Sequence, residues 1–151
     1  MLDLAILKEL RRDAKQSYRE LASKLKIHPN TLMQRIKRLE QEKVILNYTV
    51  DIDFRKVGYD LHAIVMIRTR KAKAPSMWEL DSIAKIPTVQ MLHATTGSYD
   101  AIAVLRVKDR NELVQVLRQI QQSPAVMRTN TMIVLSSFKQ LHEFNPLETM
   151  V

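Results

Sequence analysis

The stretch that decides the fold is residues 17–42, SYRELASKLKIHPNTLMQRIKRLEQE, which predicts two short helices joined by a tight turn. Ser17 and Glu20 have the spacing of a capping box, in which a hydroxyl and a carboxylate satisfy free backbone N–H groups at a helix start. After a break near Lys26, Pro29 opens the second helix, because its ring fixes a helical φ and the first turn does not need its N–H. Together these features are typical of a helix-turn-helix.

The second helix has two contrasting sides. Leu32, Ile36 and Leu39 recur at helical spacing and form one apolar stripe. The other side presents amides and cations, which pair with base edges and phosphates. A basic helix taken alone is more often an ordinary solvated face, but the capped helix and turn before this one favour a recognition helix. The candidate DNA-binding residues are Asn30, Thr31, Gln34, Arg35, Lys37 and Arg38.

Two of these candidates have particular positions on the helix. Thr31 falls in the first turn, where backbone N–H groups and a hydroxyl can hold a phosphate. Arg35 lies beside the apolar stripe rather than opposite it. Two interpretations of Arg35 therefore stay open, a phosphate contact and an intramolecular pair with Glu20.

Positive charge is concentrated around this motif. The 151 residues carry a formal net charge of +8. Residues 1–50 hold 11 Lys and Arg against 6 Asp and Glu, whereas residues 51–151 hold 13 against 10. This distribution favours a polyanionic partner, and the helix-turn-helix pattern makes double-stranded DNA the expected one.

Several classes of protein are excluded by what the sequence lacks. The absence of cysteine excludes disulfides, zinc-thiolate sites and thiol catalysis. No apolar run is longer than that of residues 63–67, which is too short to span a membrane, and no secretory signal is visible, so a cytoplasmic protein is expected. The histidines at 28, 62, 93 and 142 lack ligand spacing, and no nucleophile or phosphate loop accompanies them. We therefore expect no metal, no cofactor and no enzymatic activity.

A first helix is predicted over residues 3–14, ahead of the motif. Asp3 is its expected N-cap, and Leu4, Leu7, Leu10 and Ala14 form its apolar stripe. Because one helix cannot bury that stripe alone, the three helices are expected to pack into a DNA-binding domain over residues 1–44.

Residues 45–60 are predicted to connect this domain to the rest of the chain. Apolar and polar side chains alternate over residues 45–53, which is the pattern of a half-buried strand. The following residues up to 60, with Gly58, have no period and indicate a linker. A second domain is then expected over residues 61–151.

The second domain is predicted to consist of two similar halves. Ser76 with Glu79, and Asp109 with Glu112, have the spacing of helix caps. Each helix is followed by a proline and then by a strand that begins at a valine, in Ile86-Pro87-Thr88-Val89 and Ser123-Pro124-Ala125-Val126. The expected strands are residues 61–70, 88–95, 99–107 and 126–138, and the expected inward residues of the helices are Leu80, Ile83, Ala84, Leu113, Val116, Leu117 and Ile120.

The predicted fold class is therefore α+β, with an N-terminal three-helix helix-turn-helix domain and a C-terminal ferredoxin-like βαββαβ sandwich. Both helices of the sandwich are expected on one face of an antiparallel sheet. The other face would be bare unless a partner subunit covers it, so at least a homodimer is expected.

The sequence as a whole resembles the Lrp/AsnC, or feast/famine, family of transcription regulators. The N-terminal resemblance rests on Asp3-Leu-Ala-Ile-Leu, Glu20-Leu-Ala, Thr31 and Arg35-Ile-Lys-Arg-Leu-Glu40. The C-terminal resemblance rests on Thr96-Gly-Ser-Tyr-Asp100 and on Arg128-Thr-Asn-Thr-Met-Ile-Val134. The resemblance implies dimers that often assemble to octamers, and an amino acid that binds between dimers and changes the grip on DNA.

The resemblance also implies where an effector would bind. The candidate effector-binding residues are Gly97, Tyr99, Asp100, Thr129 and Thr131. Asp100 offers a carboxylate to the ammonium group of an amino acid, while the Gly97 turn and the threonine hydroxyls offer donors to its carboxylate. The alternatives are that Gly97 only supplies a positive φ to a turn and that Asp100 is a solvated acid.

Three positions depart from the family pattern. The family usually places Gly in the turn of the helix-turn-helix and after the recognition helix, where this chain has Lys26 and Lys43. A non-Gly residue in a left-handed cap is strained. His28 stands where a serine commonly caps the recognition helix, and it is a poorer cap.

Two rival functions remain beside a sequence-specific regulator. One is a metabolite-binding ferredoxin-like module whose basic N-terminus is incidental. The other is a non-specific architectural DNA binder without an effector. Preference for one DNA sequence over random DNA separates the regulator from the architectural binder. Loss of all DNA binding without loss of ligand binding would support the metabolite-binding module.

Overall fold

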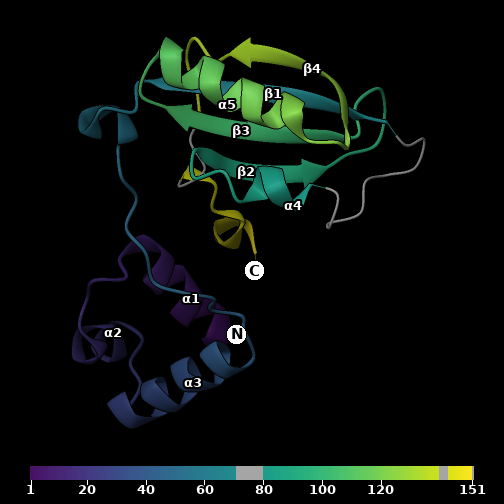
Figure 1. The fold of residues 1–151 in the computed structure, drawn as a ribbon. Helices are drawn as coiled ribbons and strands as arrows, with labels where there is room; N and C mark the ends of the chain where they lie inside the picture. The colour runs from purple at the N-terminus through teal and green to yellow at the C-terminus, as the bar shows by residue number, and fades with distance from the viewer. Residues whose placement is uncertain (71–79, 140–142, 151) are drawn as a thin grey trace. The chain divides into compact units, whose positions relative to one another are not determined.

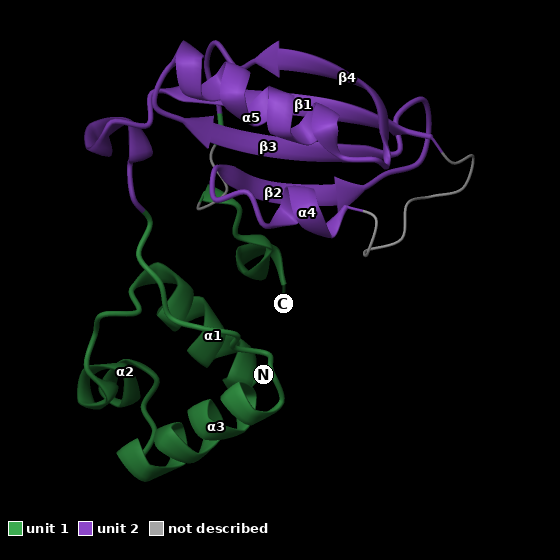
Figure 2. Ribbon diagram, in the orientation of Figure 1, with its two compact units in different colours: residues 1–51, 139–151 green, residues 52–138 purple. Residues whose placement is uncertain are grey.

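The computed structural model describes residues 1–70, 80–139 and 143–150. The chain forms two compact units, one from residues 1–51 and 139–151 and the other from residues 52–138 (Figure 2). The first unit contains α1 (Leu2–Arg12), α2 (Tyr18–Lys24), α3 (Pro29–Gln41) and the short 3-10 helix η3 (Pro146–Thr149) (Figure 1).

The predicted helix-turn-helix is present, and its local signals act as expected. Ser17 Oγ accepts from the Glu20 backbone N–H at 3.2 Å, and the Glu20 carboxylate accepts from the Ser17 N–H at 2.8 Å, which completes the capping box. At the start of α3, Nδ1 of His28 accepts from the Asn30 N–H at 3.2 Å. His28 therefore caps the recognition helix through its ring nitrogen.

The first helix differs from the prediction at both ends. It runs from Leu2 to Arg12 with Met1 at the N-cap, so Asp3 lies in its first turn and does not cap it. Ala14 lies beyond the helix and is exposed, whereas Ile6, which the predicted stripe omits, is fully buried. Ile6 packs in one apolar cluster with the predicted inward residues of α2 and α3, which are Leu21, Ala22, Leu32, Ile36 and Leu39.

Lys26 and Lys43 adopt the left-handed conformation that the departures from the family pattern predict, with φ of 53° and 58°. Each of these lysines follows the end of a helix, and its conformation lets the N–H of the next residue donate to a carbonyl in the last turn of that helix. Ile27 N–H donates to the Ala22 carbonyl at 3.0 Å, and Val44 N–H donates to the Leu39 carbonyl at 2.9 Å. Both helices thus end in Schellman-type turns that normally favour glycine.

The second unit contains a four-stranded antiparallel sheet with helices on one face (Figure 1). The strand order β2-β3-β1-β4 is that of the predicted ferredoxin-like sandwich. The predicted echo between its halves is also present, since Val89 N–H bonds to the Ile86 carbonyl and Val126 N–H to the Ser123 carbonyl. The strands are β1 (Leu61–Thr69), β2 (Val89–Ala94), β3 (Ala101–Val107) and β4 (Val126–Ile133), and the helices are α4 (Asp81–Ala84) and α5 (Arg110–Gln122).

The core of this unit lies between the sheet and its helices. Alternate residues of β1 and β3 are fully buried on the helix side. The α5 residues Leu113, Val116 and Ile120 and the α4 residue Ile83 pack against them, as predicted, while Ala84 is exposed. The predicted cap of Ser76 with Glu79 lies outside the described residues. Asp109 caps α5 through the Glu112 N–H at 2.9 Å, but the Glu112 carboxylate bonds to the Lys108 N–H instead of closing a capping box.

Two predicted strands differ from the structure, since one is shorter than expected and the other does not form. Strand β4 ends at Ile133, which pairs with Ala63 of β1, instead of continuing to residue 138. Residues 45–53 are extended but pair with no strand among the described residues, so the predicted strand is wrong for the isolated chain. The linker that follows contains a 3-10 turn, η1 (Phe54–Val57), closed by Gly58 at φ 89°.

Candidate functional site

The outer side of α3 is the strongest candidate surface. Leu32, Ile36 and Leu39 hold the helix from behind, with at most 4% of each exposed. Five of the six candidate DNA-binding residues are exposed, namely Asn30, Thr31, Gln34, Lys37 and Arg38, and Arg35 is half-buried. The helix therefore presents the predicted amides and cations outward from a rigid support.

Three of these side chains are free to contact a ligand. Within the part of the chain that the structure describes, the side chains of Thr31, Gln34 and Lys37 make no hydrogen bond or ion pair. A free amide and a free ammonium on one exposed side are the groups that read base edges and bind phosphates.

The two arginines of α3 are held by Asp3 of α1. Arg35 Nη1 donates to Asp3 Oδ1 at 2.8 Å, and Arg38 Nη2 donates to the other carboxylate oxygen. The bond from Arg35, with the charge of Arg38, holds the pKa of the Asp3 carboxyl below its ordinary value, against the opposing effect of burial. The predicted partner of Arg35, Glu20, is wrong, because its carboxylate is occupied by Ser17 in the capping box. The sequence singled out Asp3 as a helix cap, but it did not predict that Asp3 binds both arginines of α3. We refer to this contact of Asp3 with Arg35 and Arg38 as the clasp.

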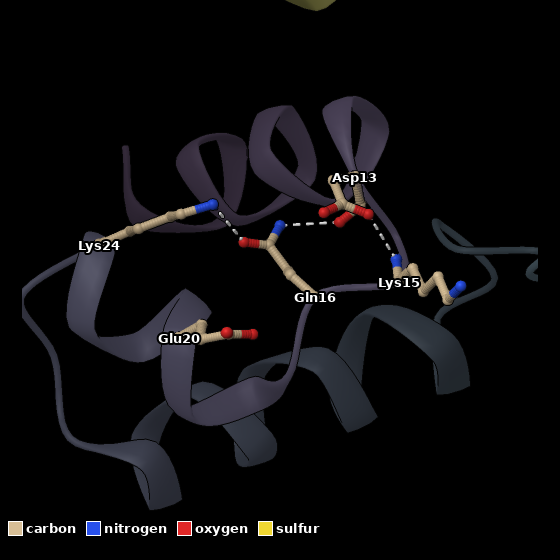
Figure 3. A pocket seen from close by; sticks show the side chains of 5 residues that line it. All are labelled: Asp13, Lys15, Gln16, Glu20 and Lys24. Atoms are coloured by element: carbon tan, nitrogen blue, oxygen red, sulfur yellow. Dashed lines mark hydrogen bonds between the residues drawn. The ribbon is translucent and has the colours of Figure 1, made fainter.

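An open hollow of about 410 Å³ lies where the end of α1 meets α2 (Figure 3). Gln16 bridges it, since its Nε2 donates to the Asp13 carbonyl at 2.8 Å and its Oε1 accepts from Lys24 Nζ at 2.8 Å. The Asp13 carboxylate accepts from the Lys15 N–H. These polar groups bond to one another rather than converge on an empty centre, so the hollow is part of the helix packing and not a ligand site.

The predicted effector residues surround one end of the sheet. The Asp100 carboxylate accepts from the Thr69 N–H at 2.7 Å and from the Thr69 hydroxyl at 3.1 Å, and Arg68 Nη1 lies 3.6 Å away. The bond from the Thr69 backbone N–H is the main cause that lowers the pKa of the Asp100 carboxyl, and Arg68 adds to it. Arg68 also donates to the Ser98 carbonyl at 3.1 Å, so this group fixes the turn at Gly97. Arg68 and Thr69 were missed because nothing in the local sequence marks them as partners of the turn.

The remaining effector candidates do not share one face of the sheet. The Tyr99 hydroxyl lies 3.3 Å from the Asn130 amide, while Thr129 Oγ1 accepts from Gln121 of α5 at 3.2 Å. Thr129 and Thr131 pair with Ile67 and Val65, the buried residues on the helix side. Gly97 has φ 105° with open space around its α-carbon, as its turn role requires. Gly97, Tyr99 and Asp100 thus lie in the connection between β2 and β3 at one end of the sheet, whereas Thr129 and Thr131 lie along the edge strand β4, on the helix side.

The described residues hold no group of three or more His, Cys, Asp or Glu side chains that could bind a metal ion. Among the same residues no helix is long and apolar enough to cross a membrane.

Comparisons with known proteins match both units. Residues 2–45 match the family model of winged helix-turn-helix DNA-binding domains, and residues 62–144 match that of the Lrp/AsnC ligand binding domain. An uncharacterized HTH-type transcriptional regulator of Pyrococcus horikoshii is 34% identical over 146 residues, covering 96% of this chain and 97% of that protein.

Solved structures agree in fold. The structure of E. coli AsnC matches with a TM-score of 0.85 at 27% identity, over 92% of this chain and 93% of that one. The feast or famine regulatory protein of M. tuberculosis, solved in complex with L-methionine, matches with a TM-score of 0.83 at 25% identity, with the same coverage. The relatives that match over nearly the whole length are named as transcriptional regulators, and this is a family of regulators rather than of enzymes. The chain belongs to the Lrp/AsnC family of DNA-binding transcriptional regulators.

Proposed function

We propose that this protein binds specific DNA sequences as a homodimer or a larger even-numbered assembly, such as an octamer, and that a small amino acid bound between dimers changes its affinity for DNA. The observation that carries the DNA half is α3, whose exposed Gln34 and Lys37 have no partner in the described chain and stand on a buried aliphatic stripe. Amide and ammonium groups so placed suit the major groove. A cytoplasmic location is part of the same proposal.

The open face of the sheet supports the assembly. Ile64 and Met66 of β1 stand beside Val104 and Ile102 of β3 on the side without helices, and Met132 of β4 continues the row. The residues of β1 and β3 in this row are half-buried and Met132 is exposed, and a partly exposed apolar row of this kind favours burial against a second copy. The exposed residues of the extended segment 45–52, with Leu46 at 78% and Val50 at 76% exposure, are the second surface that a partner subunit would cover.

The effector half of the proposal rests on the group around the Gly97 turn. Asp100 and Arg68 bring one anion and one cation to the edge of the sheet beside Tyr99 and Asn130. A zwitterion needs both charges at close range. The related M. tuberculosis protein that was solved with L-methionine makes amino acids the first ligands to test here.

Selection of bound sequences from a random DNA pool, with and without each amino acid, tests this function. We expect a defined motif and a change in its occupancy with one or a few amino acids. Enrichment without any motif would favour the architectural DNA binder. Amino-acid binding by calorimetry without any DNA binding would favour the metabolite-binding module.

A further inference from the structure

The last described residues fold back onto α1 within the first unit. Lys8 Nζ donates to the Met150 carbonyl at 2.7 Å, and Arg11 Nη2 donates to the Phe144 carbonyl at 3.0 Å. Arg12 Nε lies 3.8 Å from a carboxylate oxygen of Glu148. Lys8, Arg11 and Arg12 are spaced so that they share one face of the helix, and each of them contacts a residue of the segment 143–150.

These residues have a structure of their own. Pro146 opens η3, and the Thr149 hydroxyl donates to the Pro146 carbonyl at 2.8 Å. Asn145 and Leu147 are half-buried. We refer to residues 143–150 as the strap, because the segment is folded and held by three cations from α1.

Helix α1 contacts both the recognition helix α3 and the strap, through different side chains. Through Asp3, α1 binds both arginines of the recognition helix. Through Lys8, Arg11 and Arg12 it binds the strap. A change in how the strap contacts α1 therefore acts on the helix that orients Arg35 and Arg38.

The chain path joins the strap to the other unit. The backbone enters the second unit after residue 51 and returns to the first unit after residue 138. The return follows β4, the strand that carries Thr129 and Thr131 of the proposed effector site. The two units are therefore connected twice, once by the linker and once by the path from β4 to the strap.

We infer that the strap is a coupling element, which transmits the state of the effector unit to the DNA-binding unit by docking on α1 or leaving it. A ligand shifts such an equilibrium only if it binds the docked and undocked states with different affinity. The regulatory part of this inference rests on the proposed function, but the docking itself does not.

Cross-linking tests the docking. Because the chain has no cysteine, the pair Lys8→Cys and Met150→Cys carries the only thiols in the full chain. A short bis-maleimide should link the two within one chain, seen by mass spectrometry without a covalent dimer on a gel. The matched control replaces Lys37 of α3 instead of Lys8 and should not link. Links only between copies, or equal linking of the control, would overturn the strap.

Removal of the strap tests the coupling. A chain that ends after Phe138 should keep its affinity for DNA without amino acid but lose the change in affinity that the amino acid causes. Hydrogen exchange of the α1 amides should become roughly tenfold faster, because the strap no longer protects them. The control Asp81→Asn raises the net charge by the same one unit, outside the strap, and should leave both properties unchanged.

The two hypotheses fail in distinguishable ways. A shortened chain that keeps the full amino-acid response would overturn the coupling while the proposed function stands. Absence of any amino-acid effect in the full chain would contradict the effector proposal and the coupling, and the cross-linking result would still decide whether the strap docks. If the shortened chain does not fold, the Lys8→Ala variant of the full chain replaces it. This variant should show faster hydrogen exchange of the α1 amides and a smaller change in DNA affinity on adding the amino acid. Unchanged hydrogen exchange would contradict docking of the strap on α1.

Discussion

At the scale of single residues, Gln34 and Lys37 lie on the same exposed side of α3 but carry different chemistry. Gln34→Ala should blur base preference and cost roughly 1–3 kcal/mol on the best site, because an amide reads a base edge. Lys37→Ala should weaken all sequences alike and lower the steepness of the salt dependence, because an ammonium on a phosphate releases counterions. Titration of selected and random DNA at several salt concentrations measures both. If both variants bind as the wild type does, α3 is not the reading helix.

Lys26 and Lys43 hold a backbone conformation that costs a non-Gly residue energy. At φ of 53° and 58°, replacement by glycine removes a clash worth about 1–2 kcal/mol and adds unfolded-state entropy of about 0.5–1 kcal/mol. We therefore expect Lys26→Gly and Lys43→Gly each to stabilise the chain by roughly 0.5–1 kcal/mol in urea unfolding. The control Lys37→Gly, in the middle of α3, should instead destabilise by about 1 kcal/mol.

Asp3 makes the stability of the first unit depend on pH. Its pKa in the folded chain lies below the ordinary value of 3.8, so the unfolded chain takes up a proton first as the pH falls. The stabilisation by Asp3 is therefore complete at neutral pH and is lost as the pH falls through the folded pKa. Urea unfolding should show the wild type more stable than Asp3→Asn at neutral pH, and this difference in stability should shrink as the pH falls below the ordinary Asp value of 3.8. Both proteins retain Glu20 and Asp100, so these carboxyls do not contribute to the difference between them. A difference in stability that does not change with pH would contradict the contact of Asp3 with the arginines of α3.

At the scale of helices and strands, the sequence predicted correctly the elements whose first and last residues are determined by signals within the element itself. The capping box, Pro29 and the aliphatic spacing define α2 and α3, and all of these signals lie within the elements themselves. Strand limits depend on a partner, which the local pattern does not contain. Strand β4 stops at Ile133, the last residue that pairs with β1. Residues 45–53 have the alternating pattern of a strand but have no neighbour to pair with in the described chain.

The candidate site was predictable to a similar extent. The exposed side of α3 follows directly from helical spacing. The contacts of Asp3 with Arg35, and of Thr69 with Asp100, join residues 32 and 31 positions apart. No local pattern predicts such pairs, because they depend on how the elements pack.

The packing of α1 offers a direct test of its corrected register. Ile6 is fully buried in the core of the first unit, so Ile6→Ala should cost about 2–5 kcal/mol through lost apolar contact and a cavity. Ala14, which the sequence placed on the same stripe, is exposed beyond the helix end, and Ala14→Ser should change stability by less than about 0.5 kcal/mol. Urea unfolding of the two variants distinguishes the registers, since the predicted stripe would make Ala14 the sensitive position.

At the scale of the whole molecule, the proposed assembly rests on the bare face of the sheet. Ile64→Asp places a charge in the apolar row of β1 beside Val104 and Met132, and burial of an unpaired carboxylate against a second copy is strongly unfavourable. Light scattering at micromolar concentration should show the wild type as a dimer or larger and Ile64→Asp as a smaller species. Gln119→Glu, on the exposed side of α5, adds the same charge and should leave the mass unchanged. A monomeric wild type would refute the assembly.

The proposed assembly also predicts how a short helix achieves specificity. In a dimer, two copies of α3 related by a two-fold axis would read half-sites about 34–36 Å apart, or one helical turn of DNA. Insertion of about 5 base pairs between the half-sites turns one of them to the opposite side of the duplex, so affinity should fall steeply, whereas about 10 should restore part of it. The Ile64→Asp variant should bind all three spacings equally and weakly, because its copies read half-sites independently. Equal binding of all spacings by the wild type would show that one α3 suffices and that the dimer has no role in recognition.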